Sequence, residues 1–205
     1  MNIQLTTSSH NWRAYAASGL SPILQAALSC FADHGYHGTT VRTVAHHAGL
    51  SVPGVYHHYP SKQHLLVAIM RFAMEDLHRR CLEALEEEGP SVALRLNALI
   101  ECMVLFHAHQ SSLAFIAASE IRSLEDAARN EHIAARDALQ RMFDSLIDEG
   151  VSKGTFKAKY PRETSRAIVT MCTGVAQWYR SAGEFPPETV AVHYVEIARS
   201  ALSSR

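Results

Sequence analysis

The stretch TTVRTVAHHAGLSVPGVYHHYPSK, residues 39–62, decides the fold. It contains two short segments with helical spacing, joined by the turn AGLS. Thr39 or Thr40 can cap the first segment, and Gly49 permits a sharp turn after it. Ser51 can cap the second segment, which runs to about Tyr59 before a proline ends it. Two short helices joined in this way have the proportions of a helix-turn-helix.

A helix-turn-helix has an inner and an outer surface, and the spacing assigns residues to each. We expect Leu50 to fill the space between the two helices, and Val55 and Tyr59 to face inward. The side chains expected to point outward are those of Tyr56, His57 and His58. Their hydroxyl and imidazole groups could then contact DNA in a major groove.

The rest of the chain also has helical spacing, and no stretch alternates with the period of a strand. The expected helices are 22–34, about 40–48, 52–59, 61–85, 91–109, 111–123, 125–149, 161–180 and 187–202. Gly35 is expected to stop the first of them in a left-handed conformation. The sequence predicts an all-α protein of about nine helices, with a helix-turn-helix DNA-binding domain at 20–65 and a helical ligand-binding and dimerisation domain at 66–205.

Composition excludes some classes of protein. Of the 205 residues, 19% are charged and 47% hydrophobic, and no apolar run is long enough to suggest a membrane helix. The first residues lack the pattern of a signal peptide, so a cytoplasmic protein without membrane partners is expected. The cysteines are widely spaced in apolar stretches, which favours reduced, buried thiols. They are Cys30, Cys81, Cys102 and Cys172.

Charge is unevenly distributed. The net charge is −1, yet residues 1–65 contain three cations (Arg13, Arg42 and Lys62) and one anion (Asp33), which gives +2. Many of the 13 histidines also lie in this part. The first domain is therefore the part suited to bind the phosphates of DNA.

Residues 22–66 resemble the N-terminal DNA-binding domain of the TetR family of bacterial transcriptional repressors. The resemblance lies in the patterns F-x-x-x-G-Y-x-x-T-T-V, A-x-x-A-G-L-S and V-Y-x-H-Y-x-S-K, followed by a Leu pair. It implies DNA contacts by Thr40, Arg42, Val52, Pro53, Gly54, Tyr56, His57, His58 and Lys62. The sequence departs from commoner members at Val52, Gly54 and Tyr59, so direct base readout would depend on Arg42 and His57.

The second domain mixes apolar bulk with a few polar groups, as the wall of a pocket for a largely apolar ligand requires. The candidate ligand contacts are Met103, Phe106, His107, Phe115, Glu120, Phe143, Trp178 and Tyr179. The stretch around QWYR also resembles the branch of the family that controls fatty-acid or sterol breakdown, which implies an acyl-CoA effector. Arg122, Arg136 and Arg180 could bind its thioester or phosphate groups, or could be solvated charges.

The last two helices are expected to form a dimer interface, as the family resemblance implies. The residues expected there are Cys172, Gly174 and Ala176 on one helix and Val190, Tyr194, Ile197, Ala198 and Leu202 on the other. A homodimer implies a palindromic double-stranded DNA operator.

The sequence thus predicts a ligand-responsive repressor. It does not exclude a constitutive DNA-binding protein, and an α-helical enzyme is the third alternative. No enzyme motif is present, and the spacing of the histidines and cysteines does not suggest a metal or a cofactor.

Overall fold

The computed structural model describes residues 11–15 and 19–203, and this part contains nine α-helices, one short 3-10 helix and no strand. The elements are α1 (Pro22–Gly38), α2 (Val41–His47), α3 (Val52–His58), α4 (Lys62–Glu87), α5 (Val92–His109), α6 (Ser111–Ser119), η1 (Glu120–Ser123), α7 (Asp126–Ser152), α8 (Pro161–Trp178) and α9 (Pro187–Ser203). The predicted all-α fold of about nine helices is confirmed.

The helix boundaries follow from caps and glycines. Thr40 is the N-cap of α2 and accepts a hydrogen bond from Thr43 N at 3.1 Å, and Ser51 caps α3 in the same way. Gly49 has a φ of 65° in the turn between them. Gly35 also has a positive φ, 71°, but it bends α1 and the helix continues to Gly38. The expected stop is therefore a kink.

The helix-turn-helix has a small core of its own. Val44 of α2, Val55 of α3 and Leu65 of α4 are fully buried, with 0% of their surface exposed. Leu50, by contrast, is 41% exposed. The expectation that Leu50 fills the space between the two helices is wrong, because the turn leaves its side chain at the surface.

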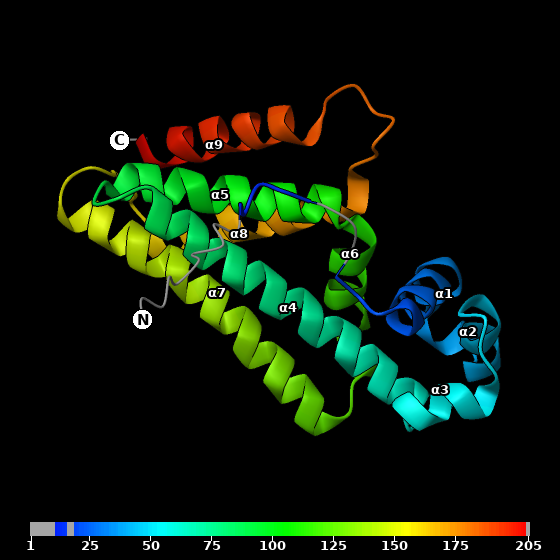
Figure 1. Ribbon diagram of the computed structural model, residues 1–205. Coiled ribbons are helices and arrows are strands. Elements are labelled where there is room, and N and C mark those ends of the chain that lie inside the picture. The colour runs from blue at the N-terminus through cyan, green and yellow to red at the C-terminus, as the bar shows by residue number, and fades with distance from the viewer. Residues whose placement is uncertain (1–10, 16–18, 204–205) are drawn as a thin grey trace, which may run out of the picture.

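The molecule has two parts joined by α4 (Figure 1). Helices α1, α2 and α3 form the smaller part, and α4 runs from them into the bundle formed by α5 to α9. Helix α1 packs against both α4 and α6. A movement of either helix within the bundle can therefore be transmitted directly to α1.

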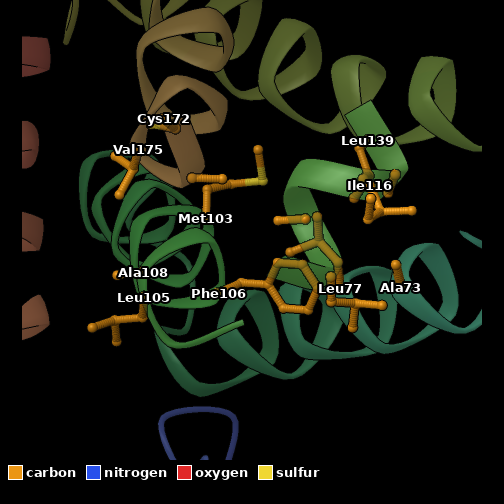
Figure 2. Close-up of a cluster of buried hydrophobic side chains, with 14 of the residues drawn as sticks. Ala73, Leu77, Met103, Leu105, Phe106, Ala108, Ile116, Leu139, Cys172 and Val175 are labelled. Carbon is orange, nitrogen blue, oxygen red and sulfur yellow. The ribbon is translucent and has the colours of Figure 1, made fainter. Parts of the chain in front are cut away.

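Helix α5 lies at the centre of the bundle and packs against α4, α7, α8 and α9. It is apolar and long enough to cross a membrane, but 67% of it is buried inside the protein, as in the core helix of a bundle. Phe106 of α5 points toward Leu77 of α4 in this core (Figure 2). The four cysteines are free and buried, as predicted.

Candidate functional site

The outer face of α3 carries the side chains predicted for DNA contact. Tyr56 is 47% exposed, and Pro53, His57 and His58 are exposed as well. The helix can present this face because Val55, on its opposite side, is buried. The expected division of α3 into an inner and an outer surface is confirmed.

The first turn of α3 has little bulk. Val52 is half-buried and packs against the core, and Gly54 adds no side chain. A Cβ atom at Gly54 would lie 3.2 Å from Ser51 Oγ, the cap atom that accepts a hydrogen bond from Gly54 N at 3.1 Å. Because Gly54 has no Cβ atom, the hydrogen bond that caps α3 is undisturbed. The first turn of the helix can also lie close to a partner.

Helix α2 contributes Thr40 and Arg42, which are both exposed. The hydroxyl of Thr40 caps the helix and lies 2.8 Å from the Thr43 hydroxyl. Arg42 has no ion-pair partner among the residues that the structure describes. Its guanidinium is available for a base or a phosphate.

Lys62 lies in a different setting from the one predicted. Its ammonium donates hydrogen bonds to Tyr36 O at 2.6 Å and Thr39 O at 2.8 Å, and lies 4.3 Å from the centre of the Tyr36 ring. Burial lowers the pKa of Lys62, and Glu120 partly opposes this shift. Lys62 holds the end of α1 against α4, and one N–H remains for a phosphate.

A cavity of about 550 Å³ lies in the bundle between α4, α5, α6, α7 and α8. Of the predicted ligand contacts, Met103, Phe106 and His107 line it. Figure 2 shows Met103 and Phe106 extending from α5 toward the neighbouring helices. The structure thus brings together three predicted residues from one helix.

The other five predicted ligand contacts do not line this cavity. Phe143 and Tyr179 are buried elsewhere, Phe115 and Trp178 are 42% and 51% exposed, and Glu120 accepts a hydrogen bond from Ser123 Oγ at 2.7 Å. Helical spacing identified these residues as apolar bulk or as polar groups among apolar ones. It does not distinguish the wall of a cavity from packed core or surface.

Several residues of the wall were missed. Ala114, Ala117 and Ala118 of α6 leave the space that larger side chains would fill, and Arg136 and Arg166 bring positive charge. Of these, the sequence suggested only Arg136 as a candidate. The short runs of alanine in α6 were the available signal for a cavity.

His107 is the polar group on the α5 side of the cavity. It is 6% exposed, and its Nδ1 lies 2.6 Å from Met103 O. Burial lowers the pKa of His107 to about 4, although the hydrogen bond to Met103 opposes this shift. The ring is therefore neutral near pH 7, and because a carbonyl only accepts, the proton resides on Nδ1. Nε2 is left as an acceptor.

Acidification is expected to destabilise the protein through His107. The folded pKa of about 4 lies below the unfolded value of 6.5, so the stabilisation is complete above pH 6.5 and is lost as the pH falls toward 4. Between about pH 7.5 and pH 5, the loss from this group is about 2 kcal/mol. Urea unfolding of wild type and His107→Gln at both pH values checks this. An equal loss in both proteins would contradict it.

Exposed apolar side chains lie on α8 and α9. Trp178, Val192 and Ile197 are 51%, 56% and 53% exposed, and the Trp178 ring stacks on Tyr194 with 6.4 Å between ring centres. The residues expected at this surface are distributed differently. Most are buried within the subunit: Cys172, Ala176, Val190, Ala198 and Leu202. Gly174, Tyr194 and Ile197 remain accessible.

Polar contacts also join the two parts of the molecule. The side-chain amide of Gln63 lies 2.8 Å from Tyr36 Oη, and when its nitrogen faces that hydroxyl it also donates to Ser123 O at 3.0 Å. The amide oxygen then accepts from Glu125 N at 2.8 Å. These bonds join α1 and α4 to the segment between α6 and α7. They therefore fix the position of α1 relative to the segment that precedes α7.

Two family profiles match the chain. Residues 23–69 match the family described as bacterial regulatory proteins, tetR family, and residues 89–202 match the one described as Tetracyclin repressor-like, C-terminal domain. The first match covers the helix-turn-helix, and the second covers the bundle.

Curated relatives and solved structures agree with these matches. The chain is 29% identical over 185 residues to the HTH-type transcriptional repressor KstR2 of Mycolicibacterium smegmatis, covering 88% of this chain and 89% of the relative. It is 30% identical over 170 residues to the HTH-type transcriptional regulatory protein RaaS of Mycobacterium tuberculosis, covering 81% and 73%. The crystal structure of AibR with isovaleryl coenzyme A and operator DNA superposes with a TM-score of 0.78, at 22% identity, covering 85% and 95%. At that identity, the likeness to AibR shows a shared fold.

Proposed function

The chain belongs to the TetR family of bacterial regulatory proteins, and from this premise we propose that it is a dimeric repressor released from its operator by an acyl-CoA ester. Its relatives are transcriptional regulators and not enzymes. Residues 20–65 would bind a palindromic DNA duplex in the cytoplasm, and residues 66–205 would bind the effector and the second subunit. The observation that carries the proposal is the 550 Å³ cavity between helices α4, α5, α6, α7 and α8.

The cavity favours a sensor over a constitutive DNA-binding protein, because a purely structural bundle has no need of a space of this size. On its α5 side, Met103 and Phe106 provide apolar surface that suits an acyl chain. Arg136 and Arg166, which are exposed, suit the phosphates of coenzyme A. AibR, whose crystal structure contains isovaleryl coenzyme A, has the same fold.

Helices α4 and α6 both line the cavity and both contact α1. An effector that separates them would change the placement of the recognition helices of the two subunits. Moving operator occupancy from 99:1 to 1:99 requires about 5.5 kcal/mol of preference for the released form, which two cavities in a dimer can share. Only such differential affinity can produce release.

Loss of one cavity arginine is expected to weaken effector binding. Arg136→Gln and Arg166→Gln should each lower the affinity for dodecanoyl-CoA roughly tenfold, because each removes a charge-assisted contact with phosphate. The affinity for free dodecanoate should not change. Arg141→Gln is the matched control, because Arg141 is exposed on the same helix as Arg136 and does not line the cavity. Calorimetry measures the affinities, and operator anisotropy measures release.

The same titration tests the proposed function as a whole. If acyl-CoA esters from short to long chains leave operator affinity unchanged, the proposed effector class is wrong.

A further inference from the structure

A second cavity, of about 280 Å³, lies between α4 and the first half of α7. Its apolar lining comes from Val67, Met70 and Met74 on one side and from Leu124, Ala128, Ala135 and Ala138 on the other. Met74 and His132 line both this cavity and the 550 Å³ cavity. The two spaces therefore meet at these two side chains, and the second is the one nearer to the DNA-binding end of α4.

His132 is buried at this junction with half of its hydrogen-bonding capacity unused. It is 5% exposed, and its Nε2 has no hydrogen-bond partner within the described protein. A buried polar atom without a partner costs about 1–3 kcal/mol, so such atoms usually have a ligand or a water beside them. His132 lines both cavities, but Nε2 itself has almost no accessible surface, so a molecule in either cavity reaches this atom only by displacing a neighbouring side chain.

The environment of His132 determines what that atom can bind. Burial lowers the pKa of His132, the charge of Arg136 lowers it further, and a hydrogen bond with the backbone of Ala117 opposes these effects. That last bond favours the protonated ring, so the ring donates in it. A neutral imidazole that donates through one nitrogen accepts through the other. The free Nε2 therefore matches a hydroxyl group and not a carbonyl.

We propose that the effector passes from the 550 Å³ cavity beyond Met74 into the α4–α7 cavity, and that a hydroxyl group on it donates to His132 Nε2. The inference rests on the proposed function, since it takes the larger cavity as the effector site. The ligand class is an elongated apolar body with a hydroxyl group part of the way along it. His107, also neutral with Nε2 as acceptor, offers a second position for a hydroxyl nearer α5.

Occupation of the second cavity would act on α4 directly. Arg71 of α4 and Glu131 of α7 line it and form a two-fold hydrogen-bonded ion pair across it, with Nε–Oε1 and Nη2–Oε2 both at 2.9 Å. This exposed pair links the two helices near the end where α4 joins the helix-turn-helix. A ligand that fills the α4–α7 cavity would fix the distance between α4 and α7 in the effector-bound form.

The test uses 2-naphthol and 2-methylnaphthalene, two probes of similar shape that differ by a hydroxyl in place of a methyl group. Calorimetry on the full-length protein gives the ratio of the two affinities. In His132→Leu, the ratio should shift roughly tenfold against 2-naphthol, because one hydrogen bond to the ligand is lost. In Met142→Leu, a change on the same helix at a side chain that packs against the core and lines neither cavity, it should stay as in wild type.

A second measurement does not depend on the variants. In wild-type protein labelled with ¹⁵N-histidine, 2-naphthol should move the His132 Nε2 resonance and 2-methylnaphthalene should not. An unchanged affinity ratio in His132→Leu, or no selective shift in wild type, would overturn the inference and leave an ordered water as the partner of Nε2. A selective shift at His107 alone would overturn it too. Operator release by acyl-CoA is measured separately, so loss of that response with naphthol selectivity intact refutes the proposed function and not this site.

Discussion

Replacement of Arg42 by alanine is expected to weaken operator binding by about 10- to 100-fold, the effect of losing one direct base contact. Arg42 is exposed and has no ion-pair partner in the described structure, so the change should leave the fold intact. His57→Ala should have an effect of the same order, because His57 is the other candidate for base readout on a helix whose first residues, 52–54, have no polar side chain. The operator can be obtained by selecting wild-type binders from randomised duplexes, and fluorescence anisotropy then gives the affinities.

The type of contact can be determined in the same experiment. A base contact by Arg42 relaxes sequence preference at one position when it is removed, whereas a phosphate contact weakens all duplexes alike and lowers the salt slope by about one. Arg141→Ala and His34→Ala are matched controls, because both side chains are exposed outside the proposed DNA surface. Full operator affinity in both Arg42→Ala and His57→Ala would disprove the assigned recognition surface.

Most of the fold was predictable because its signals are local. The cap at Ser51, the turn at Gly49 and the buried face of α3 each depend on residues within a few positions of one another. The outward position of Tyr56, His57 and His58 then followed from helical geometry. Leu50 was misplaced because its burial depends on how two helices approach each other across the turn, which spacing does not specify.

The candidate effector site was less predictable, because a cavity forms where neighbouring side chains leave space, and the sequence does not show which side chains are neighbours. Phe106 and Phe143 have the same apolar character in the sequence, yet one lines the cavity and the other is packed in the core. The difference arises from the small residues of α6 and from the angles between helices. Lys62 shows a similar limit, since its two carbonyl partners belong to a turn more than 20 residues earlier.

Disruption of the α8–α9 surface is expected to have the second large effect. Trp178 and Ile197 are exposed apolar side chains of the kind that dominate subunit interfaces. In a two-fold dimer each substitution is present twice, so Trp178→Glu and Ile197→Glu should each raise the dimer dissociation constant by about 1,000-fold or more. Analytical ultracentrifugation over a range of concentrations measures this constant.

Operator binding should fall together with dimerisation, because each subunit then binds a half-site alone and loses the advantage of two linked contacts. The helix-turn-helix itself should remain folded, since its core lies on α2, α3 and the start of α4. Leu82→Glu is the matched control, because Leu82 of α4 is also a large apolar side chain, 43% exposed, outside α8 and α9. If Trp178→Glu and Ile197→Glu remain dimeric while Leu82→Glu dissociates, the subunits associate through α4 and the operator half-site spacing follows from that geometry.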